Sequence, residues 1–250
     1  MATKKAETLS IEAAKQGDIT LTLLGQTPLY YNAMSVKAKR SLLIGGGKKT
    51  AAEKKDIKHN PEEEFRDSVY KMATGETLLC FPAPAIKGAM ATAALETAGI
   101  TKTSVQRLIF LPEEKIRVWG KPQLKMDVVR SADMNRTPDV RTRAFLPEWC
   151  AQVNIRFVTP TLSRNDIISL LINAGMLVGI GDFRQEKGRG SFGTFSVHPE
   201  DGGKEADIIN EIKKQSRMVQ THAMEVPEMA DLDTEELYQI LQEERIKRAA

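Results

Sequence analysis

Several segments of the chain alternate apolar and polar residues with a period of two, the pattern typical of a half-buried strand. Asp18–Gly25 (DITLTLLG) alternates in this way. In the segment AQVNIRFVTP the alternation places Val153, Ile155 and Phe157 on one face. Shorter apolar runs predict further strands, at 77–82, at two places in 114–130 around a Gly-Lys-Pro turn, and on either side of a glycine-rich segment at 177–183 and 193–197.

A helical pattern occupies three segments between these strands. Residues 61–73 begin with proline and three glutamates, which suit the first turn of a helix. Residues 83–99 are rich in alanine and end at Gly99, and residues 163–176 begin with Ser163 as a candidate N-cap. Beyond residue 199 we expect two helical stretches separated by EVPEMAD, the second capped by Asp233 or Thr234.

The order of these elements is strand, helix, strand, helix, an inserted hairpin with a basic loop, strand, helix, strand. This order predicts an α+β protein with a ferredoxin-like βαββαβ core and long insertions. We expect an N-terminal tail at 1–17, a core domain at 18–198 with inserted basic loops at about 35–60 and 115–145, and a C-terminal helical extension at 199–250. The last helix has a narrow apolar stripe, so we expect it to dock on a neighbour or to stay mobile.

Composition adds a soluble, intracellular character to this picture. The 250 residues contain no run of roughly 18 apolar residues, as a membrane helix needs, and the first ten residues do not resemble a signal peptide. Cys80 and Cys150 stand alone, without a Cys-x-x-Cys pair or a Cys/His cluster. We therefore expect reduced cysteines, no metal, no cofactor and a cytoplasmic location.

The net charge of +3 hides an asymmetry between the two parts of the chain. Residues 1–198 hold 29 basic and 20 acidic side chains, whereas residues 199–250 hold 7 basic and 13 acidic ones. A basic body and an acidic tail indicate a polyanionic partner for the body, although solubility alone would explain a modest excess.

The glycine-rich segment GIGDFRQEKGRGSFGTF begins at Gly179. It is no dinucleotide fingerprint, because its glycines lead into a strand and not into a helix, and the chain has no Gly-Lys-Ser/Thr of a Walker loop. Two alternatives remain: a turn between strands, or a surface that carries Arg184, Lys187 and Arg189 towards phosphates. In the second case glycine amides would approach the phosphate oxygens, the candidates being Gly179, Gly181, Gly188 and Gly190.

A second motif, FPAPAIKGAM, joins a strand to a helix. Lys87 lies in the first turns of that helix, and Gly88 would permit close approach of a ligand. The alternative is a simple junction with a surface lysine.

An arginine-rich segment, VVRSADMNRTPDVRTRAFLPEW, is the third candidate surface. Its turn-forming residues predict an irregular exposed loop. The residues proposed to contact nucleic acid are Arg130, Met134, Asn135, Arg136, Arg141 and Arg143, with Phe145 and Trp149 as stacking surfaces. The alternative is that the arginines pair with Asp127, Asp133 and Asp139 in a structural network, and that the two aromatic residues belong to the core.

The fourth candidate is a lysine-rich segment from Lys37 to Lys58. Between Ser35 and Lys58 there are eight basic and two acidic residues, and the candidates for phosphate contact are Lys37, Lys39, Arg40, Lys48 and Lys49. Such a segment is either a flexible arm that grips phosphate or a disordered, solvated loop.

Taken together, FPAPAIKGAM and GIGDFRQEKGRGSF resemble a pair of motifs in the RAMP superfamily of CRISPR-associated proteins. The resemblance covers roughly Asp18 to Val197. The chain is also similar to a group of uncharacterised proteins of tailed phages that share TPLYYN, KHNPEEEFRDS, VVRSADMNRTPDVRTRA and VGIGDFR. These resemblances imply a modified RRM-like fold and binding of RNA or single-stranded DNA.

The RAMP members most similar in layout are the backbone subunits of CRISPR effectors, which line up side by side along a guide RNA. By this resemblance Arg130–Arg143 corresponds to the inserted thumb loop. Some relatives cut RNA with a histidine and others with a loop aspartate. His59 and Asp56 are the corresponding catalytic candidates here, but neither has the surrounding motif residues.

We therefore expect a non-catalytic protein that binds single-stranded nucleic acid and forms a homo-oligomer or filament along it, in the host cytoplasm if it is phage-encoded. One alternative is a metal-independent endoribonuclease that uses His59. The other is a structural module that binds only protein. The sequence does not distinguish RNA from DNA, since contact with a 2′-OH has no signature in one dimension.

Overall fold

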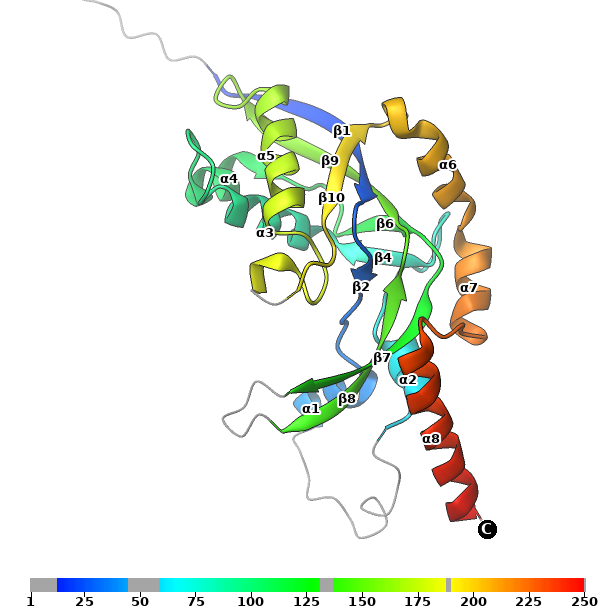
Figure 1. The fold of residues 1–250 in the computed structure, drawn as a ribbon. Helices are drawn as coiled ribbons and strands as arrows, with labels where there is room; N and C mark the ends of the chain where they lie inside the picture. Colours follow the sequence, from blue (N-terminus) through cyan, green and yellow to red (C-terminus); the bar gives the residue numbers. More distant parts are fainter. Residues whose placement is uncertain (1–12, 45–58, 131–136, 188–189, 250) are drawn as a thin grey trace, which may run out of the picture.

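The computed structural model describes residues 13–44, 59–130, 137–187 and 190–249, and the expectations below are compared with those residues. The chain is an α+β protein, and its described residues form two β-sheets (Figure 1). A seven-stranded antiparallel sheet occupies the upper part of the view, and a three-stranded sheet with its helices occupies the lower part.

The large sheet has the strand order β10-β1-β9-β6-β4-β3, and β5 pairs with β9 beside β6. Its central pair is antiparallel and runs from Lys15 opposite Thr159 to Leu24 opposite Cys150. The strands are β1 (Lys15–Gly25), β3 (Tyr70–Lys71), β4 (Leu79–Pro82), β5 (Ile109–Phe110), β6 (Lys115–Trp119), β9 (Cys150–Thr159) and β10 (Phe195–Pro199).

The predicted ferredoxin-like core is confirmed within this sheet. Along the chain, β1 is followed by helices, by β5 and β6, by β9, by another helix and by β10. In space β10 lies beside β1, β1 beside β9, and β9 beside β5 and β6, all antiparallel. This is the order of a split βαβ pair, with β3 and β4 added at one edge.

Helices cover one face of the large sheet and form the main core with it. They are α3 (Ala83–Ala93) and α5 (Arg164–Leu177), with α4 (Lys102–Leu108) beside α3. Ser163 caps α5 as predicted: its hydroxyl accepts from Asp166 N, and the Asp166 carboxylate accepts from Ser163 N. The alternation of β9 directs Val153, Ile155 and Phe157 into this core.

Part of the opposite face is covered by the C-terminal segment. Helix α6 (Ala206–Lys214) buries Ile209 and Ile212 against Leu24, Trp119 and Cys150 of the sheet. Helix α7 (Arg217–Glu225) follows it at the edge formed by β4 and β6. Short 3₁₀ turns lie at Gln185–Lys187 and Gly203–Glu205.

The remaining elements form what we call the hairpin lobe. Strands β7 (Gln123–Arg130) and β8 (Pro138–Leu146) make a long hairpin, and β2 (Leu29–Tyr30) extends it. Helix α2 (Pro61–Asp67) and helix α8 (Leu232–Ala249) pack on the hairpin, and α1 (Val36–Ile44) joins the lobe at the end of α2. Figure 1 shows this lobe below the large sheet.

Several local predictions are corrected by the structure. The strands predicted around Gly120 exist, but β6 belongs to the large sheet and β7 to the hairpin, so they do not pair with each other. The segment predicted as an irregular loop contains β8, because Thr142, Ala144 and Leu146 alternate as a buried stripe. Residues 177–183 form no strand, since Gly179 and Gly181 have positive φ angles of 72° and 89°.

The helices also differ in number and extent from those predicted. Helix α2 ends at Asp67 and α3 at Ala93, both earlier than expected, and α1 and α4 were not predicted. The C-terminal segment holds three helices in place of two. The cap of α8 is Asp231, whose carboxylate accepts from both Thr234 N and the Thr234 hydroxyl, so neither Asp233 nor Thr234 is the cap.

Candidate nucleic-acid interface

The basic residues at the start of α1 are fully presented to solvent. The side chains of Lys37, Lys39 and Arg40 are exposed, and no residue of α1 is buried. None of the three makes a side-chain hydrogen bond or an ion pair with any residue that the structure describes. They are therefore available to phosphate.

The hairpin contributes two more exposed arginines, Arg130 at the end of β7 and Arg141 on β8. Within the described part of the chain, neither side chain forms an ion pair or a hydrogen bond. Arg141 lies opposite Asp127 in the strand register, but Asp127 is 3.9 Å from Arg143 and 4.0 Å from Lys125. Two unneutralised guanidinium groups thus face outward from the hairpin.

Arg143, two residues further along β8, is corrected from a nucleic-acid contact to a structural residue. It is 5% exposed, and its Nη2 is 3.1 Å from the Asp182 carboxylate. Its guanidinium also lies 4.7 Å from the centre of the Phe183 ring. For the arginine segment, the alternative was a structural network of arginines and aspartates. Arg143 belongs to such a network, with Asp127 and Asp182 as its partners.

Burial shifts the ionisation of this network. It raises the pKa of Asp127 and lowers that of Arg143, and it also raises the pKa of Tyr30, whose side chain lies against Asp127. Asp127 Oδ2 and Arg143 Nη1 are buried atoms that lack a hydrogen-bond partner in the structure. The network therefore fixes the glycine segment to the hairpin through Asp182, with Arg143 buried and the two carboxylates partly exposed.

The aromatic residues of the arginine segment also follow the structural alternative. Trp149 is fully buried and donates its indole N–H to Thr27 O at 2.9 Å. Phe145 is half-buried, and its ring packs edge-on against Tyr30 at 5.0 Å. Neither ring is presented for base stacking in this arrangement.

His59 joins α2 to the hairpin. Its Nδ1 lies 2.9 Å from Glu64 Oε1, and its Nε2 lies 3.1 Å from Asp139 Oδ1. Both ring nitrogens are therefore engaged with carboxylates, and the ring is only partly exposed. This arrangement ties the first residues before α2 to β8, close to Arg141.

The glycine segment packs against the chain's own backbone and not into open space. Gly181 has a φ angle of 89°, and a Cβ there would lie 2.6 Å from Tyr30 O. At Gly190 an added Cβ would overlap Phe183 O, at 1.4 Å. Both positions require glycine because two stretches of backbone meet there.

Several backbone amides of this segment already donate hydrogen bonds within the chain. Gly179 N donates to Ala174 O, Ile180 N to Gly193 O, and Asp182 N to Tyr30 O. Arg184 is held within the segment, since Nε donates to Glu186 and Nη1 to Gly181 O. The expectation that Gly179 offers its amide to phosphate is corrected, because Ala174 O accepts from it. At Gly181 and Gly190 the close approach is made by the chain's own backbone, and phosphate contact there stays a prediction.

Lys87 and Gly88 of the second motif lie on α3, away from the hairpin lobe. Lys87 Nζ donates to Gln106 O at 2.9 Å and lies 5.6 Å from the centre of the Phe110 ring, so it links α3 to α4. A Cβ added at Gly88 would meet no atom within 4 Å. The structure therefore does not bring these two residues together with Arg130 and Arg141.

Eight candidate residues lie outside the described residues: Lys48, Lys49, Asp56, Met134, Asn135, Arg136, Gly188 and Arg189. Lys187 closes a 3₁₀ turn, and only its backbone is described.

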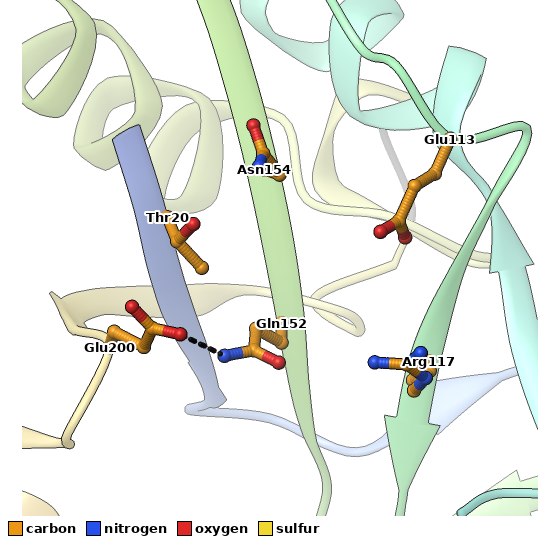
Figure 2. Close-up of a pocket in the computed structure, with 6 residues that line it drawn as sticks. All are labelled: Thr20, Glu113, Arg117, Gln152, Asn154 and Glu200. Carbon is orange, nitrogen blue, oxygen red and sulfur yellow. Dashed lines mark hydrogen bonds between the residues drawn. The ribbon is translucent and has the colours of Figure 1, made fainter. Parts of the chain in front are cut away.

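A polar hollow on the large sheet was not found from the sequence. It has a volume of about 180 Å³ and is lined by Thr20, Glu113, Arg117, Gln152, Asn154 and Glu200. Figure 2 shows Gln152 and Asn154 projecting from β9 between Thr20 on β1 and Arg117 on β6, with a hydrogen bond of 3.2 Å from Gln152 to Glu200. Two carboxylates and one guanidinium make it unsuited to phosphate.

The signal for this hollow was present in the alternation of β9. Val153 and Ile155 enter the core, so Gln152 and Asn154 must lie on the opposite face. What the alternation could not show is that α6 covers only one end of that face.

Other kinds of site find little support among the described residues. Cys80 and Cys150 are buried free thiols, and burial raises their pKa values to about 11 and about 12. Within residues 13–44, 59–130, 137–187 and 190–249, no three His, Cys, Asp or Glu side chains gather as metal ligands would. No helix of this part of the chain has both the length and the apolar character needed to span a bilayer.

Comparison with known proteins found no matching family model and no matching curated protein. Among solved structures, the chain is similar to the crystal structure of Cmr6 from Pyrococcus furiosus, with a TM-score of 0.35 and 12% identity over 73% of this chain and 98% of that one. It is also similar to a chain in the cryo-EM structure of the Type III-B Cmr-beta bound to cognate target RNA, with a TM-score of 0.35 and 13% identity over 74% of this chain and 61% of that one. Similarity at this level is too low to assign a function.

Proposed function

We propose that this chain binds single-stranded RNA or DNA through the basic side of its hairpin lobe. The observation that carries the proposal is the set of exposed, unneutralised cations on α1, β7 and β8: Lys37, Lys39, Arg40, Arg130 and Arg141. Such a set suits the phosphate backbone, and most contacts to phosphate carry no sequence information, so sequence readout would be weak.

Hydrogen bonds hold the elements that carry these cations in one lobe. Val36 N at the start of α1 donates to Asp67 at the end of α2, at 2.9 Å. Ser68 Oγ then accepts from Ala144 N of β8 at 2.8 Å. Together with the contact of His59 with Asp139, these bonds hold α1 and α2 against the hairpin, which favours binding of one strand by both groups of cations.

The proposal includes side-by-side assembly of several copies along one strand, as in the CRISPR backbone subunits that the sequence resembles. A phage-encoded relative of those subunits would not have to retain a guide RNA. Binding without catalysis is part of the proposal, because both nitrogens of His59 are engaged with carboxylates and no second catalytic group lies in a recognisable motif.

The decisive experiment measures the affinity of purified, nuclease-treated protein for labelled 20-nucleotide RNA and DNA strands at several salt concentrations. The double variant Arg130→Gln/Arg141→Gln removes two of the proposed phosphate contacts. We expect its logarithmic salt slope to be smaller than that of the wild type by about 1.4, since each contact to a single strand contributes roughly 0.7.

A matched control is Lys102→Gln/Arg107→Gln, which removes the same charge from exposed positions on α4, outside the hairpin lobe. We expect the control to keep most of the wild-type salt slope. Equal losses in both variants would mean that net charge and not the hairpin determines binding. A wild-type protein with no salt-dependent affinity for any strand would favour the alternative of a protein-binding module.

The nuclease alternative has its own test. Labelled RNA incubated with the wild type and with His59→Ala would be cleaved only by the wild type if His59 were catalytic. We expect intact RNA in both reactions.

A further inference from the structure

We propose that helix α1 of one copy docks on the outward face of helix α8 of a second copy, which would join copies head to tail. The inference deepens the proposed function, because it names the surfaces that would place copies side by side on a strand. The proposed contact joins two protein surfaces directly, so the proposal can be tested without nucleic acid.

Helix α1 is short and carries apolar side chains that no described residue covers. Its nine residues include none that is buried, and Leu42, Leu43 and Ile44 are 73%, 87% and 72% exposed. Isolated helices shorter than about 12 residues are marginal in water, and most helices in proteins are stabilised by packing of an apolar face. A consecutive run of three exposed apolar residues therefore indicates that α1 packs on a partner.

Charge determines what kind of partner fits. Helix α1 has three basic residues and no acidic one, so the partner must offer acidic groups beside apolar ones. Helix α8 presents this combination on the side that faces away from the hairpin. Its exposed apolar residues are Leu232, Ile240 and Ile246, and its exposed acidic residues are Asp233, Glu235, Glu236 and Glu243.

The spacing of charged and apolar residues also agrees between the two helices. In α1, Leu43 and Ile44 each follow a basic residue, Lys39 and Arg40, by four positions. In α8, Ile240 follows Glu236 by four positions. Residues four apart lie on the same side of a helix, about 6 Å along its axis. Two such helices lying parallel can place Glu236 against Lys39 and Ile240 against Leu43 at the same time, which leaves Lys37 and Arg40 available to phosphate.

One copy cannot satisfy both surfaces by itself, since its own α8 is bound to its own hairpin lobe. Tyr238 and Arg245 of α8 both contact Glu62 of α2, and Thr234 accepts from Met126 N of β7. Figure 1 shows α1 and α8 on different sides of the hairpin. Because two different surfaces meet, the contact is heterologous and can be repeated from copy to copy.

The test is sedimentation velocity of the full chain, free of nucleic acid, over a range of protein concentrations. We expect the wild type to form oligomers that grow with concentration. Two variants each disable one surface: Leu43→Ser/Ile44→Ser on α1, and Glu236→Lys/Ile240→Ser on α8. All four side chains are exposed, so we expect each variant to melt at the same temperature as the wild type. We expect the affinity of self-association to fall by a factor of at least about ten in each variant.

Mixing the two variants provides the sharper result. Each variant keeps the surface that the other lacks, so an equimolar mixture should form a heterodimer and nothing larger. A wild type that stays monomeric at every concentration would overturn the proposal, as would variants that assemble as the wild type does. Flotation of the wild type with anionic vesicles, lost in Leu43→Ser/Ile44→Ser, would instead assign the apolar run of α1 to a lipid surface and would equally overturn it.

Failure of this proposal and failure of nucleic-acid binding can be told apart. A strand too short for two copies reports binding by one copy, and the α1 variant Leu43→Ser/Ile44→Ser should bind it as the wild type does. On a long strand the same variant should lose the cooperativity of the wild type. Loss of affinity on the short strand would instead show that the apolar run belongs to the nucleic-acid site, which contradicts docking on α8.

Discussion

At the scale of single residues, Arg141 and Arg143 show how two neighbours of one type receive opposite roles. They lie two positions apart on β8 and therefore point to the same face of the hairpin. Arg141 is exposed, whereas Arg143 lies deeper, where Asp182 and Phe183 of the glycine segment cover it. The difference between them is imposed by a segment that is 40 residues away in sequence.

This contrast predicts different outcomes for the same substitution. Arg143→Gln removes the only cation beside Asp182 among the described residues and leaves Asp127 with Lys125 alone, so we expect it to lower the free energy of unfolding by about 2 kcal/mol. Arg141→Gln should change it by less than about 0.5 kcal/mol and should weaken binding of nucleic acid. Urea denaturation followed by circular dichroism measures the first effect. Two variants of equal stability would contradict the buried role of Arg143.

The site could be predicted from sequence only as far as composition allows. The arginine-rich and lysine-rich segments were identified as candidate surfaces, and Arg130, Arg141 and the basic residues of α1 remain so. The glycine segment was assigned to phosphate because local sequence does not show that Tyr30 O and Gly193 O accept hydrogen bonds from Asp182 N and Ile180 N within it. That information is a tertiary contact between distant segments.

At the scale of elements, α8 is attached to α2 chiefly by polar contacts around Glu62. Its carboxylate accepts from Tyr238 Oη at 2.6 Å and from Arg245 at 3.0 Å and 3.1 Å. The hydrogen bond from Arg245 is the main reason why the pKa of Glu62 falls from 4.5 to about 2. A carboxyl with a lowered pKa in the folded state stabilises that state in its ionised form.

The stability of the contact between α8 and α2 should therefore depend on pH between about 2 and 4.5. Its stabilisation is present in full above the ordinary pKa of 4.5, decreases as pH falls from there, and is lost below about 2, where Glu62 is protonated in both the folded and the unfolded state. We expect Glu62→Gln to be less stable than the wild type at pH 6, and the difference to narrow as pH falls from 4.5 through about 2. Hydrogen exchange of the α8 amides at several pH values measures it. A difference that stays constant across this range would contradict the role of Glu62.

Elements with strong local patterns were predicted well, and elements that depend on neighbours were not. The alternation of β1 and β9 and the capping box of α5 are local, and all three elements are present. Strand β8 was missed because Pro138 and its charged residues favour a loop, although pairing along β7 overrides that preference. The partner of β7 could not be read from the sequence, since a Gly-Lys-Pro turn also suits a change of sheet at Gly120.

At the scale of the whole molecule, the C-terminal segment completes both sheets and is not a separate appendage. Gln220 of α7 is fully buried, and its side chain accepts from Leu78 N and Leu79 N and donates to Val118 O and Gly120 O. Residues 228–230 bond to Leu124 of β7, and α8 covers the apolar side of the hairpin. The acidic segment thus supplies hydrogen bonds and apolar surface that the basic body lacks.

Two truncations of different length test this division of roles. Ending the chain before residue 200 removes Gln220 and its four hydrogen bonds to the backbone of the large sheet, and it uncovers Leu24, Trp119 and Cys150. Since the truncation exposes this apolar cluster to water, we expect an insoluble product. Ending the chain before Leu232 keeps α6 and α7, so the large sheet should still fold.

In the shorter truncation only the hairpin should lose its cover, because Leu124 and Met126 pack beneath the removed helix and Met126 N loses its bond to Thr234. We expect this protein to be soluble, to keep the near-ultraviolet signal of the buried Trp119 and Trp149, and to be cut by protease first within β7 and β8. The full chain should resist cleavage there. If the chain that ends before residue 200 is soluble and melts cooperatively, the large sheet is complete without the C-terminal segment. This outcome would contradict the structural role assigned to Gln220.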